Sequence, residues 1–461
     1  MNILLIQPPS SEPLLDQVYL FEPLALEYLA AGLQHNGHTV EILDARLDPD
    51  VECALQRFRP QLVGLTGYTC HLNILKQLAL RCKKYDPAPT LVVGGHHATV
   101  APEDFNLPQF DAVVIGEGTT TLCELVTALE QGDDFKDIVG IAIPRTDGLV
   151  FTPSRPWPEL DSLPLPAREL TAGHRHHYAS EWLKPLASVR TSLGCVARCN
   201  FCALWALTGG RYLRRAVENV IAELREIKEE NVFFCDDESM CDVRRMEQLA
   251  DAIRSSGIMK HYFLYARVDT IVAYPELFRK WRDIGLLQVF VGMEDFSDAR
   301  LAALAKGTTV AQQEQAVRIL NGLGVMMYAS FMIDPAYKRS DFRALIAYVR
   351  RLKLKYATFT VLTPLPGTEL YARRKNELIS TRPEHFDMLH TLLPTCLTLP
   401  EFYAEYARVL QHAIPLRVAF RNVLRFGWRH LGLRLRLLNT FLKRIRNAWQ
   451  DYEDYDWQRH A

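Results

Sequence analysis

The chain has 461 residues, of which 48% are hydrophobic and 23% are charged, and its formal net charge at pH 7 is -1. This length suits two or three domains with sizeable cores. The balanced charge gives no field that favours nucleic acid, so we expect no nucleic-acid partner. Ten cysteines over this length do not make a disulfide scaffold. We see no leader peptide and no apolar run of spanning length, and therefore expect a cytoplasmic protein with reduced thiols.

Short apolar runs alternate with helical patterns over residues 1–145. Because strand and helix alternate, this region is predicted to be a Rossmann-like, doubly wound α/β domain whose ligands bind beyond the carboxyl ends of its strands. No G-x-G-x-x-G follows the first run, so the dinucleotide fingerprint is missing. The predicted strands lie at 2–9, 39–45, 62–68, 90–97 and 111–118.

Residues 146–188 are rich in proline, which prevents long regular elements, and are predicted to be a linker. The run GHRHHY at 173–178 holds three histidines. Because no spaced partner ligands follow them, we interpret this run as a solvated loop rather than a metal site.

Strand–helix alternation returns over residues 189–375. Six such units predict a full or partial (β/α) barrel, in which the loops after the strands carry the chemistry. The predicted strands are 188–192, 232–237, 262–268, 287–294, 325–333 and 356–364. Residues 376–461 are predicted to form a C-terminal helical region.

Three cysteines, Cys195, Cys199 and Cys202, follow the first of these strands with the spacing C-x3-C-x2-C. A structural zinc site would need a fourth ligand, and a disulfide framework would need an even number. Three thiolates can hold three corners of a [4Fe-4S] cluster and leave one iron open. We expect the other seven cysteines to be mostly small buried hydrophobic residues.

In this context the chain resembles the radical S-adenosylmethionine (SAM) enzymes, and within them the cobalamin-binding class. The resemblance implies that the three cysteines bind the cluster, that SAM chelates the open iron, and that Phe201 stands beside the adenine. It also implies an external electron donor. No catalytic residue is expected beyond the cluster ligands.

Further matches follow along the predicted barrel. The runs VFFCDDESM, YARVD, VGMEDFSDARLAALAKGTT and LTPLPGTELY resemble motifs of this class. By that resemblance Asp236, Arg267 and Glu294 are candidate SAM contacts, with barrel-end salt bridging as the alternative for Arg267 and Glu294. The run FMIDP departs from the family, which usually has a glycine where Asp334 stands.

Two runs of the first domain, VVGGHHATVAPEDF and VVIGEGTTTLCEL, resemble the cobalamin-binding domain of this class. Glycines at strand ends allow the backbone to approach a large planar ligand. The D-x-H-x-x-G signature of other cobalamin proteins is absent, so we expect a base-off cofactor with its lower face covered by protein. The candidate cobalamin contacts are Thr66, Thr69, Gly94, Gly95, His97, Thr99, Gly116, Glu117 and Gly118; a loop hydrogen bond is the alternative for His97.

The resemblance implies one reaction sequence that uses both domains. A reduced cluster cleaves SAM to a 5'-deoxyadenosyl radical, which removes a hydrogen atom from an unactivated carbon. That carbon then takes a methyl group from methylcobalamin. A second SAM restores the methyl group. Such cofactors supply the chemistry, while the protein positions them and excludes water.

Residues 411–446 contain nine Lys or Arg and no Asp or Glu. On a helical wheel the basic side chains gather on one side and the apolar ones lie largely opposite, a pattern typical of helices on membrane surfaces. The alternative is a helix that packs on the barrel with a solvated basic face. The basic sector comprises Arg417, Arg421, Arg425, Arg429, Arg436, Lys443 and Arg446, and Gly427 and Gly432 are predicted to break it into two or three helices.

Within its class, the whole chain is similar to the hopanoid methylases, which methylate the A-ring of a membrane lipid. Overall likeness favours the carbon-3 type over the carbon-2 type. We therefore expect an apolar lipid substrate and a peripheral association with the inner membrane. Two alternatives stay open: a cobalamin radical SAM enzyme that methylates or closes a ring on another apolar substrate, and a non-catalytic cobalamin sensor.

Overall fold

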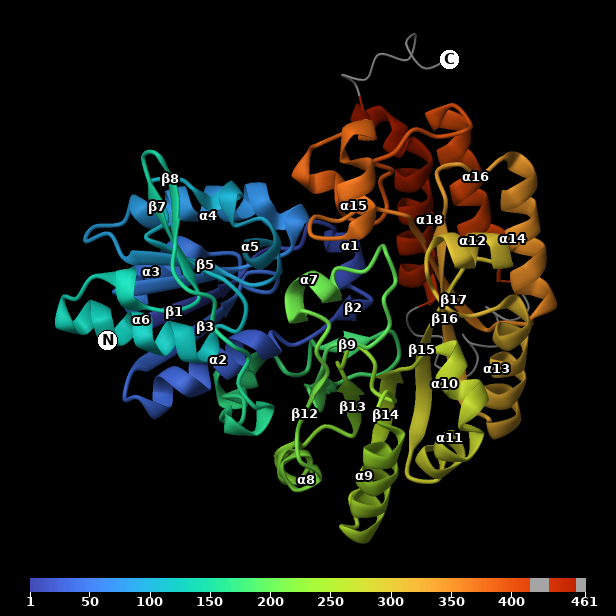
Figure 1. Cartoon of the computed structure of the whole chain (residues 1–461), viewed down its shortest axis with the longest axis horizontal. Helices are drawn as coiled ribbons and strands as arrows, with labels where there is room; N and C mark the ends of the chain where they lie inside the picture. The colour runs from blue at the N-terminus through green and yellow to red at the C-terminus, as the bar shows by residue number, and fades with distance from the viewer. Residues whose placement is uncertain (415–430, 453–461) are drawn as a thin grey trace. The chain divides into compact units, whose positions relative to one another are not determined.

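The structure is a computed structural model, and it describes residues 1–414 and 431–452. The chain forms two compact units. The first holds Met1–Gly194 and Ala203–Glu229, and the second holds Cys195–Cys202 and Glu230–Ala461. Figure 1 labels the helices and strands of both units.

The first unit is built on a seven-stranded sheet. Its strands are β1 (Asn2–Gln7), β3 (Thr39–Asp44), β4 (Leu62–Thr66), β5 (Thr90–Gly94), β6 (Ala112–Val114), β7 (Ile141–Arg145) and β8 (Gly148–Phe151). They lie in the order β3-β1-β4-β5-β6-β7-β8, parallel as far as β6 and antiparallel beyond it. The winding reverses between β1 and β4, and ligands of such sheets bind at this switch point.

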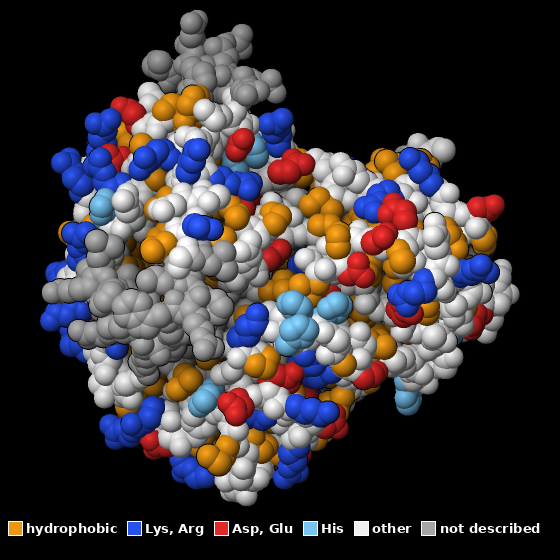
Figure 2. All heavy atoms as spheres, turned by 180° about the vertical axis from the view of Figure 1, so that it is seen from behind, with side chains coloured by type: hydrophobic (Ala, Val, Ile, Leu, Met, Phe, Trp, Pro, Cys, Tyr) orange, Lys and Arg blue, Asp and Glu red, His pale blue; other side chains and the backbone are white. Residues whose placement is uncertain are grey.

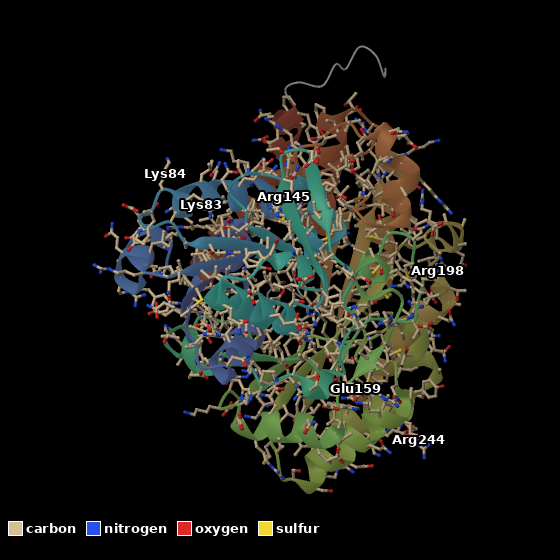
Figure 3. The ribbon with its side chains drawn as sticks, turned by 60° about the vertical axis from the view of Figure 1, so that its left-hand side comes forward. Lys83, Lys84, Arg145, Glu159, Arg198 and Arg244 are labelled. Atoms are coloured by element: carbon tan, nitrogen blue, oxygen red, sulfur yellow. The ribbon has the colours of Figure 1, made fainter. Side chains whose placement is uncertain are left out.

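Helices cover both faces of this sheet because successive side chains of a strand point to opposite faces. Leu4 and Ile6 of β1 pack in one core with α3 (Val51–Phe58) and α4 (Leu72–Lys83). Ile3 and Leu5 pack in the other core with α2 (Leu24–His35) and α6 (Thr119–Gln131). The charged side chain of Arg145 in β7 lies on the outside of the unit (Figure 3). The predicted doubly wound domain is confirmed.

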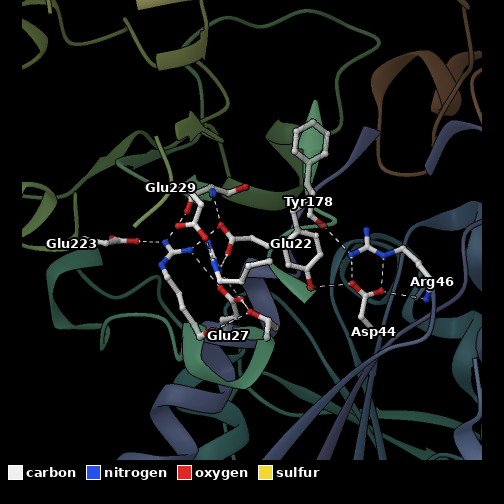
Figure 4. Close-up of polar contacts among 12 residues, drawn as sticks. Glu22, Glu27, Asp44, Arg46, Tyr178, Glu223 and Glu229 are labelled. Atoms are coloured by element: carbon white, nitrogen blue, oxygen red, sulfur yellow. Dashed lines mark hydrogen bonds and ion pairs between the residues drawn. The ribbon is translucent and has the colours of Figure 1, made fainter. Parts of the chain in front are cut away.

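Residues 146–188 are part of this unit and are not a separate linker. Arg168 pairs with the buried Glu22 at 2.8 Å and with Glu223 at 2.5 Å, while Arg175 pairs with Glu22 at 2.6 Å and with Glu229 (Figure 4). Buried charges are tolerated when they are paired in this way. The partners are far apart in sequence, so the proline content alone gave no sign of them.

The first unit also contains several shorter helices and strands. They are α1 (Pro13–Asp16), β2 (Tyr19–Leu20), α5 (His96–Val100), β9 (Ala179–Ser180), β10 (Leu186–Val189), β11 (Ser192–Leu193), α7 (Leu204–Thr208), β12 (Leu213–Arg214) and α8 (Val217–Glu226). Strand β2 pairs with β9, and β11 pairs with β12, both antiparallel.

The second unit contains parallel strands in sequence order, β13 (Asn231–Phe234), β14 (His261–Tyr265), β15 (Leu286–Glu294), β16 (Met326–Ile333) and β17 (Tyr356–Val361). The order is linear, so the predicted barrel is partial. The helices between and after the strands are α9 (Val243–Ser255), α10 (Val268–Ala273), α11 (Pro275–Arg282), α12 (Asp298–Ala303), α13 (Val310–Leu323), α14 (Arg339–Arg351) and α15 (Glu369–Arg374).

The C-terminal region is helical, as predicted. It contains α16 (Leu399–His412), α18 (Leu431–Asn447) and a final 3-10 turn, η9 (Ala448–Tyr452). Helix α18 packs against α16. Gly432 is the second residue of α18, whereas Gly427 lies outside the described residues. Among residues 1–414 and 431–452, no helix has the length and apolar content needed to cross a membrane.

Candidate functional site

A pocket with a cavity volume of about 180 Å³ opens at the switch point of the first unit. Its inner walls come from β1, β4, β5, α2 and α6 and are largely apolar. Its mouth is formed by the residues that end the strands. Six of the nine predicted cobalamin contacts line it, namely Thr66, Gly94, Gly95, Gly116, Glu117 and Gly118.

Gly95 shows why glycine is needed at this mouth. Its φ is +90°, a backbone conformation that favours glycine, and a Cβ atom would lie 2.2 Å from Oγ1 of Thr66. Gly116, with a φ of +81°, has no heavy atom within 4 Å of an added Cβ. At the mouth of the pocket, the backbone of the glycines is therefore not covered by side chains of their own. Such a surface fits a bulky ligand that approaches the main chain closely.

The other three predicted contacts lie outside the pocket lining. Thr99 donates through Oγ1 to the carbonyl of Gly95 at 2.8 Å and accepts from the Gly116 N–H at 3.1 Å, which ties the two glycine turns together. His97 is buried, with Nδ1 3.0 Å from Oγ1 of Thr69 and Nε2 3.0 Å from Asp104. Thr69, His97 and Thr99 do not line the pocket, and Thr99 holds together the two glycine turns that do.

Two further residues that line the pocket, Trp157 and Arg190, were not predicted. The guanidinium of Arg190 lies 4.7 Å from the ring centroid of Tyr28, which also lines the pocket. Trp157 belongs to the segment predicted as a linker, and Arg190 to a predicted barrel strand. No motif marks either of them, so only the fold could bring them to this pocket.

The three cysteines of the second unit share one short loop. Cys195 and Cys199 are buried and Cys202 is half-buried. The Ala197 N–H donates to Sγ of Cys195 at 3.4 Å. Burial raises the pKa of Cys195, and this hydrogen bond opposes the rise only in part. In the described part of the chain, no three His, Cys, Asp or Glu side chains are grouped for a single metal ion. A cluster differs in this respect, because each thiolate binds a different iron atom.

Arg267 connects this loop to the ends of the barrel strands. It follows β14, pairs with Asp269 at 3.0 Å, donates to the carbonyl of Lys306 at 2.9 Å, and lies 3.9 Å from Sγ of Cys199. Burial opposes its charge, yet Asp269 and the nearby thiols raise the pKa of Arg267 above its usual value. This fixed positive charge suits a loop that holds thiolates.

Glu294 ends β15 in a left-handed conformation, with a φ of +64°. Its Oε1 accepts from Nζ of Lys306 at 2.6 Å, and both side chains are buried. A Cβ atom at Gly292 would lie 2.2 Å from that same oxygen, which explains the glycine two residues before the acid. Lys306 lies in the run VGMEDFSDARLAALAKGTT but was not predicted as a site residue.

Two acids after β13 are buried, Asp236 and Glu238. Glu238, which was not predicted, accepts from the Arg267 N–H at 3.3 Å. Burial raises the pKa of Glu238 to about 7. The run VFFCDDESM contains Asp236 and Asp237 as an acid pair, and nothing in it marks Glu238 separately.

Three buried polar atoms near these groups have no hydrogen-bond partner, namely Oδ1 of Asn200, Oγ of Ser239 and Oγ1 of Thr308. Such atoms are rare in folded proteins and commonly await a ligand. Asn200 is otherwise well held, because its Nδ2 donates to the Ala303 carbonyl at 2.7 Å and its N–H to Leu304 at 3.2 Å. Phe201 is half-buried on the same loop. These residues fit a polar cosubstrate beside the three thiols.

Asp334, where the family usually has glycine, caps a turn after β16. Its Oδ1 accepts from the Ala336 N–H at 2.8 Å, and its carbonyl accepts from the Tyr337 N–H at 2.9 Å. The departure from the family pattern therefore has a local structural role.

The fold and these two sites define a protein that places one cofactor at a doubly wound sheet and another at a three-thiol loop. A family model described as B12 binding domain matches residues 17–126, and one described as Radical SAM superfamily matches residues 189–349. A hopanoid C-3 methylase of Methylococcus capsulatus is 28% identical, over 98% of this chain and 87% of the relative. An uncharacterized methyltransferase of Pyrococcus horikoshii is 31% identical, over 82% of this chain and 85% of the relative.

A solved structure shows the same fold at lower identity. It is the radical S-adenosylmethionine methyltransferase TsrM of Kitasatospora setae with cobalamin and a [4Fe-4S] cluster bound. The TM-score is 0.66 at 20% identity, over 80% of this chain and 76% of that one. This chain belongs to the cobalamin-binding radical SAM family. It is a methyltransferase of that kind, with a [4Fe-4S] cluster, SAM and cobalamin as cofactors, as predicted.

Proposed function

We propose that the enzyme transfers a methyl group to an unactivated carbon of a hopanoid lipid, and that this carbon is C-3 of the A-ring. The observation that carries the proposal is the similarity to a hopanoid C-3 methylase over 98% of the chain. The relative with higher identity is uncharacterized and therefore does not bear on the substrate.

In this proposal Cys195, Cys199 and Cys202 hold the cluster, and the pocket at β4 and β5 holds the nucleotide tail of cobalamin. The cofactors supply the radical and the methyl group when bound. The chain's own residues position them: Arg267 balances the charge of the thiolates, and Glu294 is held by Lys306. The unpartnered oxygens of Asn200 and Ser239 are available to SAM.

A lipid substrate requires access to a membrane, and α18 offers a surface for it. This helix contains five Lys or Arg and no Asp or Glu. Leu435 and Leu438 are 51% and 47% exposed, and Arg436, Lys443 and Arg446 of the same helix are also exposed. Basic residues next to exposed leucines favour binding at an anionic bilayer surface. The other predicted basic residues, Arg417, Arg421, Arg425 and Arg429, lie outside the described residues.

The test is expression in a bacterium that makes hopanoids and lacks hopanoid methylases of its own. Mass spectrometry of its lipids should show a hopanoid heavier by one methyl group, with the fragment pattern of an A-ring methylated at C-3. A variant with Cys195, Cys199 and Cys202 changed to Ala is the control, and its lipids should be unmodified. Methylation at C-2 would contradict the assignment of the carbon. Unmodified hopanoids beside cleavage of SAM by the purified enzyme would contradict the substrate.

The alternatives differ in what the purified enzyme consumes. A methylase of this class uses two SAM for each product, because one is cleaved to the radical and the other replaces the methyl group. Ring closure transfers no methyl group, so SAM would be consumed without a methylated product. A non-catalytic sensor would bind cobalamin and produce no 5'-deoxyadenosine. Quantification of 5'-deoxyadenosine and S-adenosylhomocysteine therefore separates the three.

A further inference from the structure

Among the described residues that line the pocket of the first unit, two carry a charged side chain, Glu117 and Arg190. The nucleotide tail of cobalamin also carries a charge, because its phosphodiester is a strong acid and is ionised at neutral pH. A charge that leaves water is stable in a protein only when it is paired. A tail in this pocket therefore requires a group of opposite sign from the lining.

The start of α6 is the place where such an anion would ordinarily bind. Helix N-termini bind phosphate through backbone N–H groups that have no partner within the helix, and Gly118 brings this helix start to the pocket. In this chain Glu117 occupies that position. Its Oε1 accepts from the Thr119 N–H at 2.7 Å, and its Oε2 accepts from the Thr120 N–H at 3.3 Å. Because this carboxylate is buried against the helix start, α6 would repel a phosphate.

Arg190 supplies the positive charge of the lining and is held there by contacts that do not neutralise it. Its guanidinium lies 4.7 Å from the ring centroid of Tyr28, a buried residue of α2 that also lines the pocket. Its carbonyl accepts from Nη1 of Arg215 at 3.1 Å, and Arg215 pairs with Glu223. In the described part of the chain, no carboxylate forms an ion pair with Arg190. An arginine whose flat face rests on a ring still presents its N–H edge to a ligand.

We propose that Arg190 binds the phosphodiester in the nucleotide tail of cobalamin. Guanidinium and phosphate form charge-assisted hydrogen bonds, which are stronger than hydrogen bonds between neutral groups. The phosphodiester joins the ribose and base of the tail to the corrin, so this contact would hold the tail at its middle. The proposal rests on the tail lying in this pocket, as proposed above, and not on the identity of the substrate.

The experiment compares hydroxocobalamin, which carries the phosphodiester, with cobinamide, which ends before it. The full chain, purified without corrinoid, is titrated with each compound, and binding is followed by the absorbance of the corrin. Arg190→Met should weaken the affinity for hydroxocobalamin by about tenfold and leave that for cobinamide unchanged. Arg190→Lys keeps the charge and should retain part of the affinity. Arg57→Met is the matched control: the Arg57 side chain is 62% exposed in the same unit, and its variant should match wild type.

Salt gives a second readout that needs no variant. Because ions screen a charge pair, wild-type affinity for hydroxocobalamin should fall with salt more steeply than its affinity for cobinamide. Equal salt dependence of the two compounds would overturn the proposal, and so would wild-type affinity of Arg190→Met for hydroxocobalamin. An equal loss of affinity for both compounds in Arg190→Met would also overturn it, because the arginine would then contact the corrin or only support the pocket. No lipid is present in these titrations, so methyl transfer to a lipid stays a separate question.

Discussion

At the scale of single residues, Gly95 and Gly37 share a left-handed backbone and differ in their surroundings. Their φ values are +90° and +83°, but an added Cβ at Gly95 lies 2.2 Å from Thr66, whereas one at Gly37 has nothing within 4 Å. Either Gly→Ala change should cost about 1–2 kcal/mol of folding free energy from backbone strain.

Only Gly95→Ala should weaken cobalamin binding, because its methyl group intrudes on the mouth of the pocket. Titration with hydroxocobalamin, followed by absorbance, compares both variants with wild type. Equal affinities of the Gly95→Ala and Gly37→Ala proteins would remove this glycine from the cofactor site.

The buried pair of Glu294 and Lys306 allows a second prediction. Glu294→Gln should lower the free energy of unfolding by about 3–5 kcal/mol, because it leaves the Lys306 charge buried without its partner. The double variant Glu294→Gln with Lys306→Met should regain much of this stability. Chemical denaturation measures both. The exposed pair of Glu276 and Arg279 is the control, and Glu276→Gln should change stability by no more than about 0.5 kcal/mol.

The same variants separate a cofactor contact from a purely structural ion pair. If Glu294 touches SAM, the double variant stays weak in SAM binding although it is stable again. Recovery of SAM binding together with stability would show that the pair only holds the end of β15.

Whether a site residue can be recognised in the sequence depends on whether its partners are close to it in the chain. The cysteine spacing and the paired glycines are contiguous runs, so their pattern can be recognised without a fold. Glu238 and Asn200 lie beside recognised motifs. Their hydrogen-bond partners, Arg267 and Ala303, are far away in the chain. His97 and Thr99 stand in a recognised motif, yet neither lines the pocket. The motifs therefore indicated where the site lies, but not which of their residues line the pocket.

At the scale of elements, the predicted parallel strands were found because each is a short buried apolar run. The antiparallel hairpin of β7 and β8 was missed. Strand β8 lies at the sheet edge, where burial is incomplete, and the buried apolar run of β7 is only three residues long. The segment 146–188 was misread for another reason. Its order comes from ion pairs of Arg168 and Arg175 with distant acids, which prolines in the local sequence do not reveal.

The histidines of the segment 173–178 are a case where the pattern was ambiguous. Figure 2 shows histidine side chains gathered at one place on the surface. The rings of His176 and His177 are 4.0 Å apart, and that of His174 is 6.5 Å from His177. His176 and His177 are exposed in a turn, and the interpretation of the run as a solvated loop stays a prediction.

His390 helps to hold the end of the described chain, where Arg382 also donates to the carbonyl of Asp451 at 2.8 Å and the Tyr452 hydroxyl donates to the Thr391 carbonyl at 2.8 Å. Nδ1 of His390 lies 2.9 Å from Asp387 and Nε2 lies 3.1 Å from Asp451, which belongs to η9. Burial alone would lower the pKa of His390, but hydrogen bonds to Asp387 and Asp451 raise it from 6.5 to about 9. The stacked His385, whose pKa burial lowers to about 4, stays neutral beside it.

Because the folded pKa lies above the unfolded value, the protonated His390 stabilises the fold fully below pH 6.5, and this contribution is lost as pH rises through 9. The loss should approach about 3 kcal/mol at most. Hydrogen exchange of residues 448–452 should therefore accelerate between pH 7 and 9, after correction for intrinsic rates. In His390→Gln the exchange should be fast at every pH. A wild-type protection factor that is constant over this range would contradict the assignment.

At the scale of the whole molecule, a net charge of -1 conceals an uneven distribution along the chain. Residues 411–446 carry nine positive charges and no negative one, so the rest of the chain carries the opposite excess. Composition alone excluded a general attraction to polyanions. It did not exclude a local one, and local attraction is what the proposed lipid substrate would require.

The basic, leucine-containing face of α18 leads to the last prediction. Changing both Leu435 and Leu438 to Ser removes two half-exposed apolar side chains, each worth about 1 kcal/mol on insertion, and should weaken vesicle binding roughly thirtyfold. Binding of the wild type should also fall with salt, since surface attraction is screened over about 8 Å at physiological ionic strength. Co-sedimentation with vesicles that do or do not contain anionic lipid measures both effects. Leu80→Ser with Leu287→Ser is the matched control, because these leucines are 47% and 39% exposed on other helices or strands. If the α18 variant pelleted as well as this control, the exposed side of α18 would be a solvated basic face that does not bind the membrane.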